Sequence, residues 1–239
     1  MYNLFTFYSQ QIQMTLVLGA RCSDGVAIIA DTKITGQEGT FFGHEPKLYG
    51  ELHNIIFGCA GSKKMVQLFR RYVLGDVTAL RDSPDLEYTN LNLFDKLKEI
   101  MNFFRDVREG NDYLLAVMIG RIVSGCSDLH TVDSLGRLDF EFTKSWKAIG
   151  TGGEDANKIV NEEWQDSMTM KEFSSLSYSV IKYIEKQKPN GKVGVGTGKP
   201  NIRYLAQGAQ NDTEPSNQEW ISFDNSYPDY ESEFENYIL

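Results

Sequence analysis

Residues 14–35 read MTLVLGARCSDGVAIIADTKIT, and this stretch decides the fold class. Two apolar runs, 16–23 and 25–30, meet at Asp24-Gly25, a dipeptide that predicts a β-hairpin with a type I′ turn. Both runs are apolar at successive positions, which is typical of strands covered on both faces in the interior of a layered sandwich. The second run ends in Asp31 and Lys33, two charges that close an otherwise apolar strand.

The rest of the chain alternates groups of strands with pairs of helices. Ser62 is a suitable N-cap for a helix that follows a strand, and Pro189 and Gly191 end the last predicted helix. The apolar periodicity predicts strands at 54–61, 113–122, 129–133, 138–142, 192–196 and 201–206, and helices after Ser62 and at 91–109, 154–164 and 170–187. This order predicts an α+β fold, a four-layer α/β/β/α sandwich in which helices cover the outer faces of two packed sheets.

The chain divides into one domain and two flanking segments. We expect an N-terminal extension or propeptide over 1–14, a single domain over 15–207, and an acidic tail over 208–239. No Lys or Arg follows Arg203, so the tail concentrates the acidic charge, as solvated chain ends usually do.

Composition excludes several classes of function. The net charge of −9 argues against a nucleic-acid partner, because phosphate binding needs a surplus of Lys and Arg. Three widely spaced cysteines fit reduced thiols, and neither they nor His44, His53 and His130 have the spacing of a metal site. No apolar run reaches the roughly 18 residues of a membrane span, and residues 1–13 lack the basic start of a signal peptide. We therefore expect a cytoplasmic protein without a membrane, metal or cofactor partner.

The chemistry centres on Thr15. A threonine hydroxyl is a poor nucleophile until a base removes its proton, and none of the three histidines lies in a recognisable catalytic context. An N-terminal threonine supplies the base itself, since an α-amino group has a pKa of about 7.7–8.0. A neighbouring ammonium group lowers that pKa further, and Lys47, held by Asp31, is the candidate neighbour.

From Thr15 onwards the sequence resembles the β-type subunits of the proteasome, which are N-terminal-nucleophile hydrolases. In that family an Asp follows the first Thr by sixteen residues, a Lys follows it by thirty-two, and an Ala-Gly pair ends the next strand. Asp31 and Lys47 stand at those distances from Thr15 (31 − 15 = 16 and 47 − 15 = 32), and Ala60-Gly61 ends NIIFGCAG. The likeness continues more weakly to about residue 207, and MYNLFTFYSQQIQ lacks the Tyr-rich motif of the catalytically silent α-type subunits.

The resemblance implies a role for each matching residue. Thr15 would be the nucleophile, Lys47 would tune its amine, Asp31 would orient the lysine, and the Gly61 N–H would stabilise the oxyanion. Thr151, in AIGTGGEDANKIV, stands where the family has a serine beside the catalytic amine. The implied substrate contacts are Thr35, for the substrate backbone, and a pocket lined by Glu45, Tyr49, Cys59 and Lys63.

Two features depart from the family pattern. The fourth family helix typically ends in Asp-x-x-Ser-Gly-Gly, whereas the corresponding stretch here is Gln187-Lys188-Pro189-Asn190-Gly191. Met14 replaces the glycine that normally precedes the threonine in self-cleaving precursors. We expect that translation begins at Met14 and that an aminopeptidase removes it; the alternative is a propeptide of residues 1–14 removed by autolysis.

The leading hypothesis is a threonine-type endopeptidase subunit of a proteasome-like, self-compartmentalised protease. Its implied partners are polypeptide substrates, the same or related subunits in stacked rings, and an ATP-dependent unfoldase. Two alternatives stay open: a non-catalytic ring subunit, which the missing Asp-x-x-Ser favours, and a non-proteolytic amidohydrolase that uses the same threonine on small amides.

Overall fold

The computed structural model describes residues 12–13, 15–35, 41–44, 46–52, 55–69, 115–123, 125–133, 138–139, 145–187 and 200–206. The strands are β1 (Ile12–Gln13), β2 (Leu16–Cys22), β3 (Gly25–Ala30), β4 (Lys33–Thr35), β5 (Phe41–His44), β6 (Leu48–Leu52), β7 (Ile55–Ser62), β8 (Leu115–Val123), β9 (Cys126–Asp133), β10 (Leu138–Asp139), β11 (Trp146–Gly150) and β12 (Asn201–Ala206). The helices are α1 (Lys63–Phe69), α4 (Gly153–Glu163) and α5 (Met170–Gln187).

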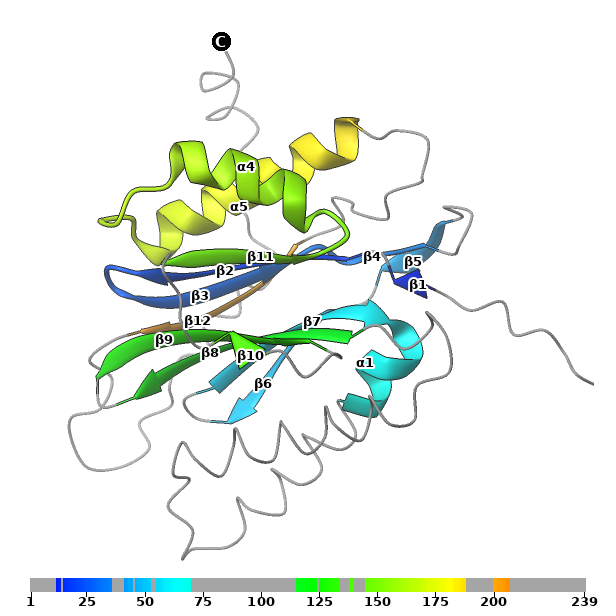
Figure 1. Cartoon of the computed structure of the whole chain (residues 1–239), viewed down its shortest axis with the longest axis horizontal. Coiled ribbons are helices and arrows are strands. Elements are labelled where there is room, and N and C mark those ends of the chain that lie inside the picture. Colours follow the sequence, from blue (N-terminus) through cyan, green and yellow to red (C-terminus); the bar gives the residue numbers. More distant parts are fainter. Residues whose placement is uncertain are drawn as a thin grey trace, which may run out of the picture.

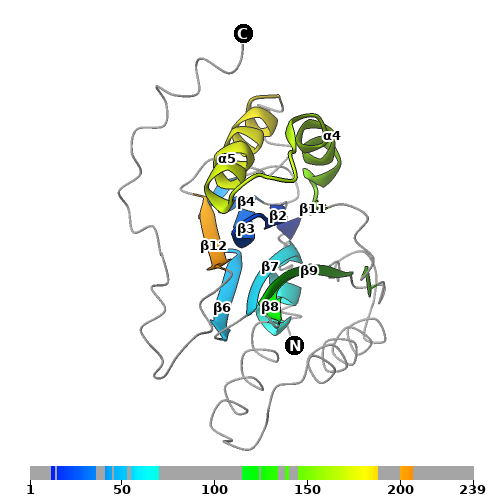
Figure 2. The ribbon, with the colours of Figure 1, turned by 90° about the vertical axis from the view of Figure 1, so that its left-hand side faces the viewer.

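Two antiparallel sheets lie face to face (Figures 1 and 2). Sheet A has the order β1-β7-β8-β9-β10, with β6 also paired to β7, and sheet B has the order β11-β2-β3-β12. Strands β4 and β5 pair with each other and form a short ribbon. The hairpin of β2 and β3 therefore occupies the middle of sheet B, as its continuous apolar runs predict.

Helices cover the outer faces of the sheets. α4 and α5 lie over sheet B, and α1 packs on β7 through an edge-to-face contact of Phe57 and Phe69, whose ring centroids are 6.0 Å apart. Ser62 caps α1 as predicted, because its hydroxyl accepts a hydrogen bond from the Met65 N–H at 3.3 Å. The predicted helix 91–109 lies outside the described residues, so within the described part α1 represents the helical layer on sheet A.

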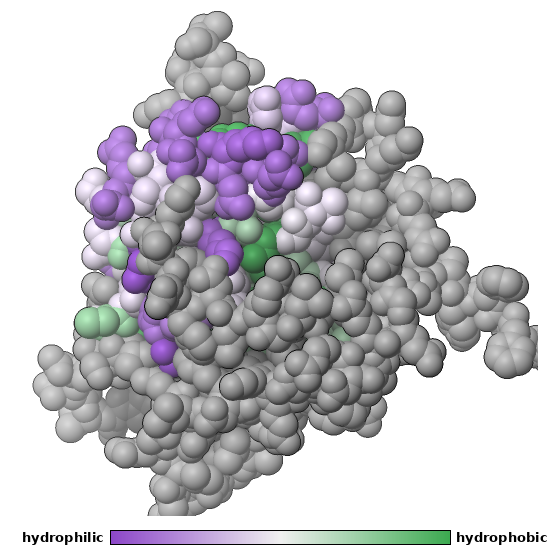
Figure 3. All heavy atoms as spheres, in the orientation of Figure 1, coloured by the Kyte–Doolittle hydropathy of each residue, from purple (hydrophilic) through white to green (hydrophobic). Residues whose placement is uncertain are grey.

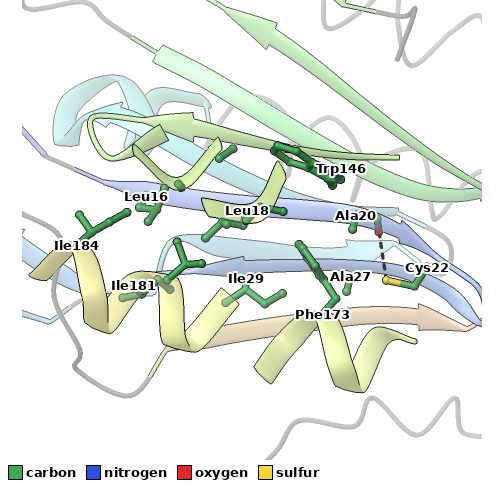
Figure 4. Close-up of a cluster of buried hydrophobic side chains, with 14 residues drawn as sticks. Leu16, Leu18, Ala20, Cys22, Ala27, Ile29, Trp146, Phe173, Ile181 and Ile184 are labelled. Atoms are coloured by element: carbon green, nitrogen blue, oxygen red, sulfur yellow. Dashed lines mark hydrogen bonds between the residues drawn. The ribbon is translucent and has the colours of Figure 1, made fainter. Parts of the chain in front are cut away.

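The strands of sheet B send side chains into two separate cores. One core lies between the sheets, where Val17, Ile28 and Ile56 are fully buried. The other lies between sheet B and the helices, where Leu18 and Ile29 meet Phe173 and Ile181 (Figure 4). Burial on both faces explains why the β2 and β3 sequences do not alternate between apolar and polar residues.

The turn of this hairpin differs from the prediction. The two-residue turn is Ser23-Asp24, and Gly25 already pairs with Cys22 as the first residue of β3. The α5 start explains the shift, since the Ser23 N–H donates to the Met168 carbonyl and the Asp24 carboxylate accepts from the Met170 N–H at 2.8 Å. A side chain at position 25 would meet the Leu205 carbonyl, which favours glycine there.

Most other predicted elements are confirmed within a few residues. The predicted strands 54–61, 113–122 and 201–206 appear as β7, β8 and β12, and the helices 154–164 and 170–187 as α4 and α5. β9 is longer than the predicted 129–133, and of 138–142 the described part is β10. The predicted strand 192–196 lies outside the described residues, and β4, β5, β6 and β11 were missed.

The described surface is polar over the helices of sheet B. Figure 3 shows mostly hydrophilic residues over α4 and α5. The exposed residues of α4 include Glu154, Lys158 and Glu162. Within the described part of the chain, no helix has the length and apolar character needed to span a membrane.

Candidate active site

Thr15 lies directly before β2 at the edge of the two-sheet core. The residue is 1% exposed, and its carbonyl accepts a hydrogen bond from the Thr151 N–H at 2.9 Å. This contact continues the antiparallel pairing in which Leu16 lies opposite Gly150. Thr151 itself is exposed, directly after β11, and its backbone is what the structure places against Thr15.

Asp31 and Lys47 form a buried ion pair next to Thr15. The exposed fractions of their side chains are 0% and 1%, and Lys47 Nζ donates to Asp31 Oδ1 at 2.9 Å and to Oδ2 at 3.0 Å. Oδ1 also accepts from the N–H of Leu16, the residue after Thr15, at 2.8 Å. One carboxylate thus connects the catalytic lysine candidate to the backbone beside the threonine.

The Lys33 carbonyl is a third described acceptor for the lysine ammonium group. Lys47 Nζ donates to it at 2.7 Å, so three acceptor oxygens surround an ammonium group that has three N–H donors. A buried charge is tolerated when it is paired and hydrogen-bonded in this way. Sequence reasoning predicted that Lys33 pairs with nearby carboxylates and assigned it no chemical step, and a backbone acceptor leaves no signal in the residue type.

Gly150 is a site residue that sequence reasoning missed. Its φ of +93° lies in the left-handed region that favours glycine, and a Cβ there would come within 2.0 Å of the Thr15 carbonyl oxygen and 3.1 Å of the Ala60 Cβ. Only glycine lets β11 approach the threonine and the end of β7 this closely. A glycine directly before Thr151 in KAIGTGG was the available signal.

Gly61 lies at the junction of three strands. It pairs with Leu115 of β8 on one side and with Gln13 of β1 on the other, and its φ is +148°. Ile12 and Gln13, which precede Thr15 by two or three residues, therefore lie antiparallel to Ser62 and Gly61 at an edge of sheet A. An extended chain segment can add to the glycine-bearing end of β7 in this geometry.

Comparison with known protein families identifies the family of this chain. The family model described as Proteasome subunit matches residues 14–195, more than half of the sequence. The chain belongs to the proteasome subunit family. A comparison with curated proteins found no match. The matched range begins one residue before Thr15 and includes Asp31, Lys47, Gly61 and Thr151.

Family membership supports the N-terminal-nucleophile hydrolase sandwich as the fold of this proteasome subunit, in agreement with the two packed sheets. Proteins of this family are generally proteases that assemble into stacked rings with related subunits. The described residues contain no cluster of His, Cys, Asp and Glu that could hold a metal ion.

The structure describes some of the predicted substrate-binding residues and not others. Tyr49 lies on β6 with its hydroxyl donating to the Pro46 carbonyl at 3.0 Å, and Cys59 lies on β7 with no exposed surface. Thr35 ends β4 and Lys63 begins α1, but their side chains are outside the described set, as is the whole of Glu45. Burial raises the pKa of the Cys59 thiol well above its usual range, so this side chain offers neutral sulfur rather than a thiolate.

The C-terminal end of α5 contacts β4 through a described ion pair. Glu185 lies 3.8 Å from Lys33 Nζ, and both side chains are partly exposed. Gln187, where the family typically has Asp, is the exposed last residue of the helix, and 188–199 lie outside the described residues.

Proposed function

We propose that this proteasome-family chain is a β-type, threonine-type endopeptidase subunit of a self-compartmentalised protease. The observation that carries the proposal is the Asp31 carboxylate, which binds the Leu16 N–H beside Thr15 and the buried Lys47 ammonium with the same oxygen. A structural ion pair needs no such connection to the residue after a candidate nucleophile.

The reaction would use two groups of one residue. Thr15 Oγ attacks the carbonyl carbon of the scissile peptide bond, while the freed α-amine takes the hydroxyl proton and passes it to the leaving amine. The Lys47 cation lowers the pKa of that α-amine towards neutrality, and Asp31 keeps the cation in place. The Gly61 N–H stabilises the oxyanion, Thr151 assists beside the amine, and water then hydrolyses the acyl-enzyme. No metal or cofactor takes part.

Release of the Thr15 amine is a precondition, because an amide nitrogen cannot act as a base. Either an aminopeptidase removes an initiating Met14, or the chain cuts the bond between Met14 and Thr15 itself. The pairing of Ile12 and Gln13 with Ser62 and Gly61 supports the second route, since it lays the residues before the bond along the strand end that carries the oxyanion glycine. In both cases the mature domain would run over 15–207, followed by the acidic segment 208–239.

The last part of the proposal is that the active site is enclosed within an assembly of subunits. The chain would line a ring-shaped compartment formed with the same or related subunits, receive unfolded polypeptides from an ATP-dependent unfoldase, and work in the cytoplasm. Thr35, Glu45, Tyr49, Cys59 and Lys63 would contact the substrate.

A non-catalytic ring subunit is the second candidate. The observation that favours it is the stretch from Gln187 to Gly191, which lacks the Asp and Ser that support the threonine in most β-type relatives. In that case the buried ion pair would only stabilise the fold.

Hydrolysis assays on assembled protein separate these functions. The intact mass of the assembled protein is measured first, and the protein that begins at Thr15 is incubated with an unfolded protein and with short fluorogenic peptides, beside the Thr15→Ala variant. Cleavage of the unfolded protein that disappears in Thr15→Ala supports the protease. No cleavage by protein that begins at Thr15 supports the scaffold, and cleavage of small amides alone supports an amidohydrolase.

A further inference from the structure

The ribbon of β4 and β5 has little backbone support, although it carries a group that the site needs. The two strands pair only with each other among the described strands, and their register shifts between Ile34 and Thr35. A two-stranded antiparallel pair is marginally stable by itself. Yet the first residue of β4 supplies the Lys33 carbonyl that binds Lys47 Nζ at 2.7 Å. The position of that carbonyl depends on the interactions that hold the ribbon.

His44 provides a side-chain link at this point. It is the last residue of β5 and lies opposite Lys33 in the pairing, and its Nδ1 is 3.0 Å from the Thr32 hydroxyl oxygen. Thr32 is only 7% exposed, so its hydroxyl needs a partner within the protein, and the described partner is this imidazole. Depending on the tautomer, the hydroxyl donates to Nδ1 or the Nδ1–H donates to the hydroxyl.

Thr32 lies between the two residues that supply the described acceptors of the lysine ammonium group. It stands between Asp31, whose two carboxylate oxygens bind Nζ, and Lys33, whose carbonyl supplies the third acceptor. The Lys33–Glu185 pair restrains the same segment from α5, but at 3.8 Å and with partly exposed side chains it is a weak restraint. The bond between His44 and the Thr32 hydroxyl is shorter, at 3.0 Å, and its Thr32 end is buried although His44 is exposed.

We propose that His44 is a positioning residue for the threonine protease reaction: through Thr32 it sets where Asp31 and the Lys33 carbonyl hold the Lys47 ammonium group. The assignment rests on the proposed function. A catalytic group displaced by on the order of 1 Å can lose about 100-fold in rate, so loosening one of three acceptors is expected to lower kcat by about tenfold. The loss in kcat is expected to exceed any rise in KM, because the bond itself contacts no substrate. A smaller rise in KM is expected because the ribbon carries Thr35 and is followed by Glu45, two of the proposed substrate contacts.

Four single variants of the assembled enzyme, and the double variant that combines His44→Ala with Thr32→Val, test the assignment. His44→Ala and Thr32→Val each remove the bond, and His44→Asn keeps a polar atom near the place of Nδ1. Lys158→Ala, at an exposed residue of α4, serves as the control. Steady-state kinetics on a fluorogenic peptide give kcat and KM, and hydrogen exchange measured by mass spectrometry on peptides spanning 31–44 reports how firmly the ribbon is held.

The expected result is a lower kcat with faster exchange in His44→Ala and Thr32→Val, no further loss when the two are combined, and recovery of both readouts in His44→Asn. An active wild-type enzyme whose kcat and exchange are indifferent to His44→Ala overturns the assignment alone. Equal kcat losses in His44→Ala and His44→Asn overturn it as well. Wild-type protein that begins at Thr15 and hydrolyses nothing overturns the proposed function and this assignment together.

Discussion

At the scale of single residues, the buried pair of Asp31 and Lys47 combines a stability cost with the catalytic role proposed for it. Moving two charges out of water is unfavourable, and their attraction and hydrogen bonds offset that loss only when the geometry is good. Three short bonds to Nζ and one from the Leu16 N–H to Asp31 meet this condition. Two apolar side chains could fill the same space, so the charges themselves point to chemistry.

Removing one charge or both is expected to have different consequences. Lys47→Met alone leaves a buried carboxylate without its cation and is expected to lower the free energy of unfolding by about 3–5 kcal/mol. The double variant Asp31→Asn with Lys47→Met leaves no uncompensated charge, so most of that stability should return. Peptide hydrolysis should nevertheless stay at least about 100-fold below wild type, because the amine has lost the cation beside it. Thermal melts and initial rates measure the two effects, and an active double variant would contradict the role of the pair.

Gly150 allows a matched test of backbone approach. Gly150→Ala adds a Cβ within 2.0 Å of the Thr15 carbonyl at a φ of +93°, whereas Gly125→Ala adds one at a φ of +78° with no atom within 4 Å. The control should therefore show only backbone strain, about 1 kcal/mol, and the site variant should lose more stability and displace Thr15. Chemical denaturation measures the stability of both variants. Equal losses of stability would show that the close approach of residue 150 to Thr15 does not matter for stability.

At the scale of elements, the β8–β9 hairpin contains a second charged cluster at the far end of sheet A from Gly61. Arg121 Nε and Nη2 donate to Asp128 Oδ2 at 2.8 and 2.6 Å, and His130 Nε2 lies 2.6 Å from the same oxygen. Partial burial raises the pKa of Asp128, but the hydrogen bonds and positive charges of His130 and Arg121 outweigh it and hold the pKa at about 2, below the ordinary 3.8.

Because the pKa of Asp128 is lowered, the pH range in which this carboxylate stabilises the fold can be predicted. A carboxyl group with a lowered pKa in the folded state adds stability that is complete above the unfolded pKa of 3.8 and is lost as the pH falls towards 2. Asp128→Asn should therefore be less stable than wild type at pH 5, by about 1 kcal/mol after allowance for partial exposure, and the difference should shrink between pH 4 and pH 2. Urea denaturation at several pH values measures it. The control is Glu154→Gln, which removes an exposed ion pair with Lys158. Its difference in stability from wild type should be small and should change little with pH.

The same elements show how far the sequence predicts the structure. The long apolar runs at β2, β3 and β7 and the periodic stripe of α5 were predictable, because burial on two faces or along one helical stripe leaves a strong pattern. β4, β5 and β6 were not, since they are short and the pairings of β4 with β5 and of β6 with β7 each contain a register shift. Asp31 and Lys47 were predictable from the spacing in the family that the sequence resembles. Gly150 and the Lys33 carbonyl act through the backbone, and of these two only Gly150 left a signal in the sequence, the glycine directly before Thr151.

At the scale of the whole molecule, the fold brings together segments from four parts of the sequence. Thr15 comes from the start of sheet B, Lys47 from the segment before β6, Gly61 from the end of β7 and Thr151 from the end of β11. Family membership adds that such subunits assemble into stacked rings with related subunits. The site lies where strand ends from both sheets meet.

The central claim is that the hydroxyl and the amine of Thr15 act together, and one measurement tests it most directly. Purified, assembled protein is treated with a peptide epoxyketone, whose two electrophilic carbons can bond to a hydroxyl and an amine of the same residue, and the adduct is located by mass spectrometry. The account predicts one adduct per chain, joined through both atoms of an N-terminal Thr15 and absent in Thr15→Ala. A chain that begins at Thr15 and yet forms no adduct there, or one that reacts equally well in Thr15→Ala, would contradict it.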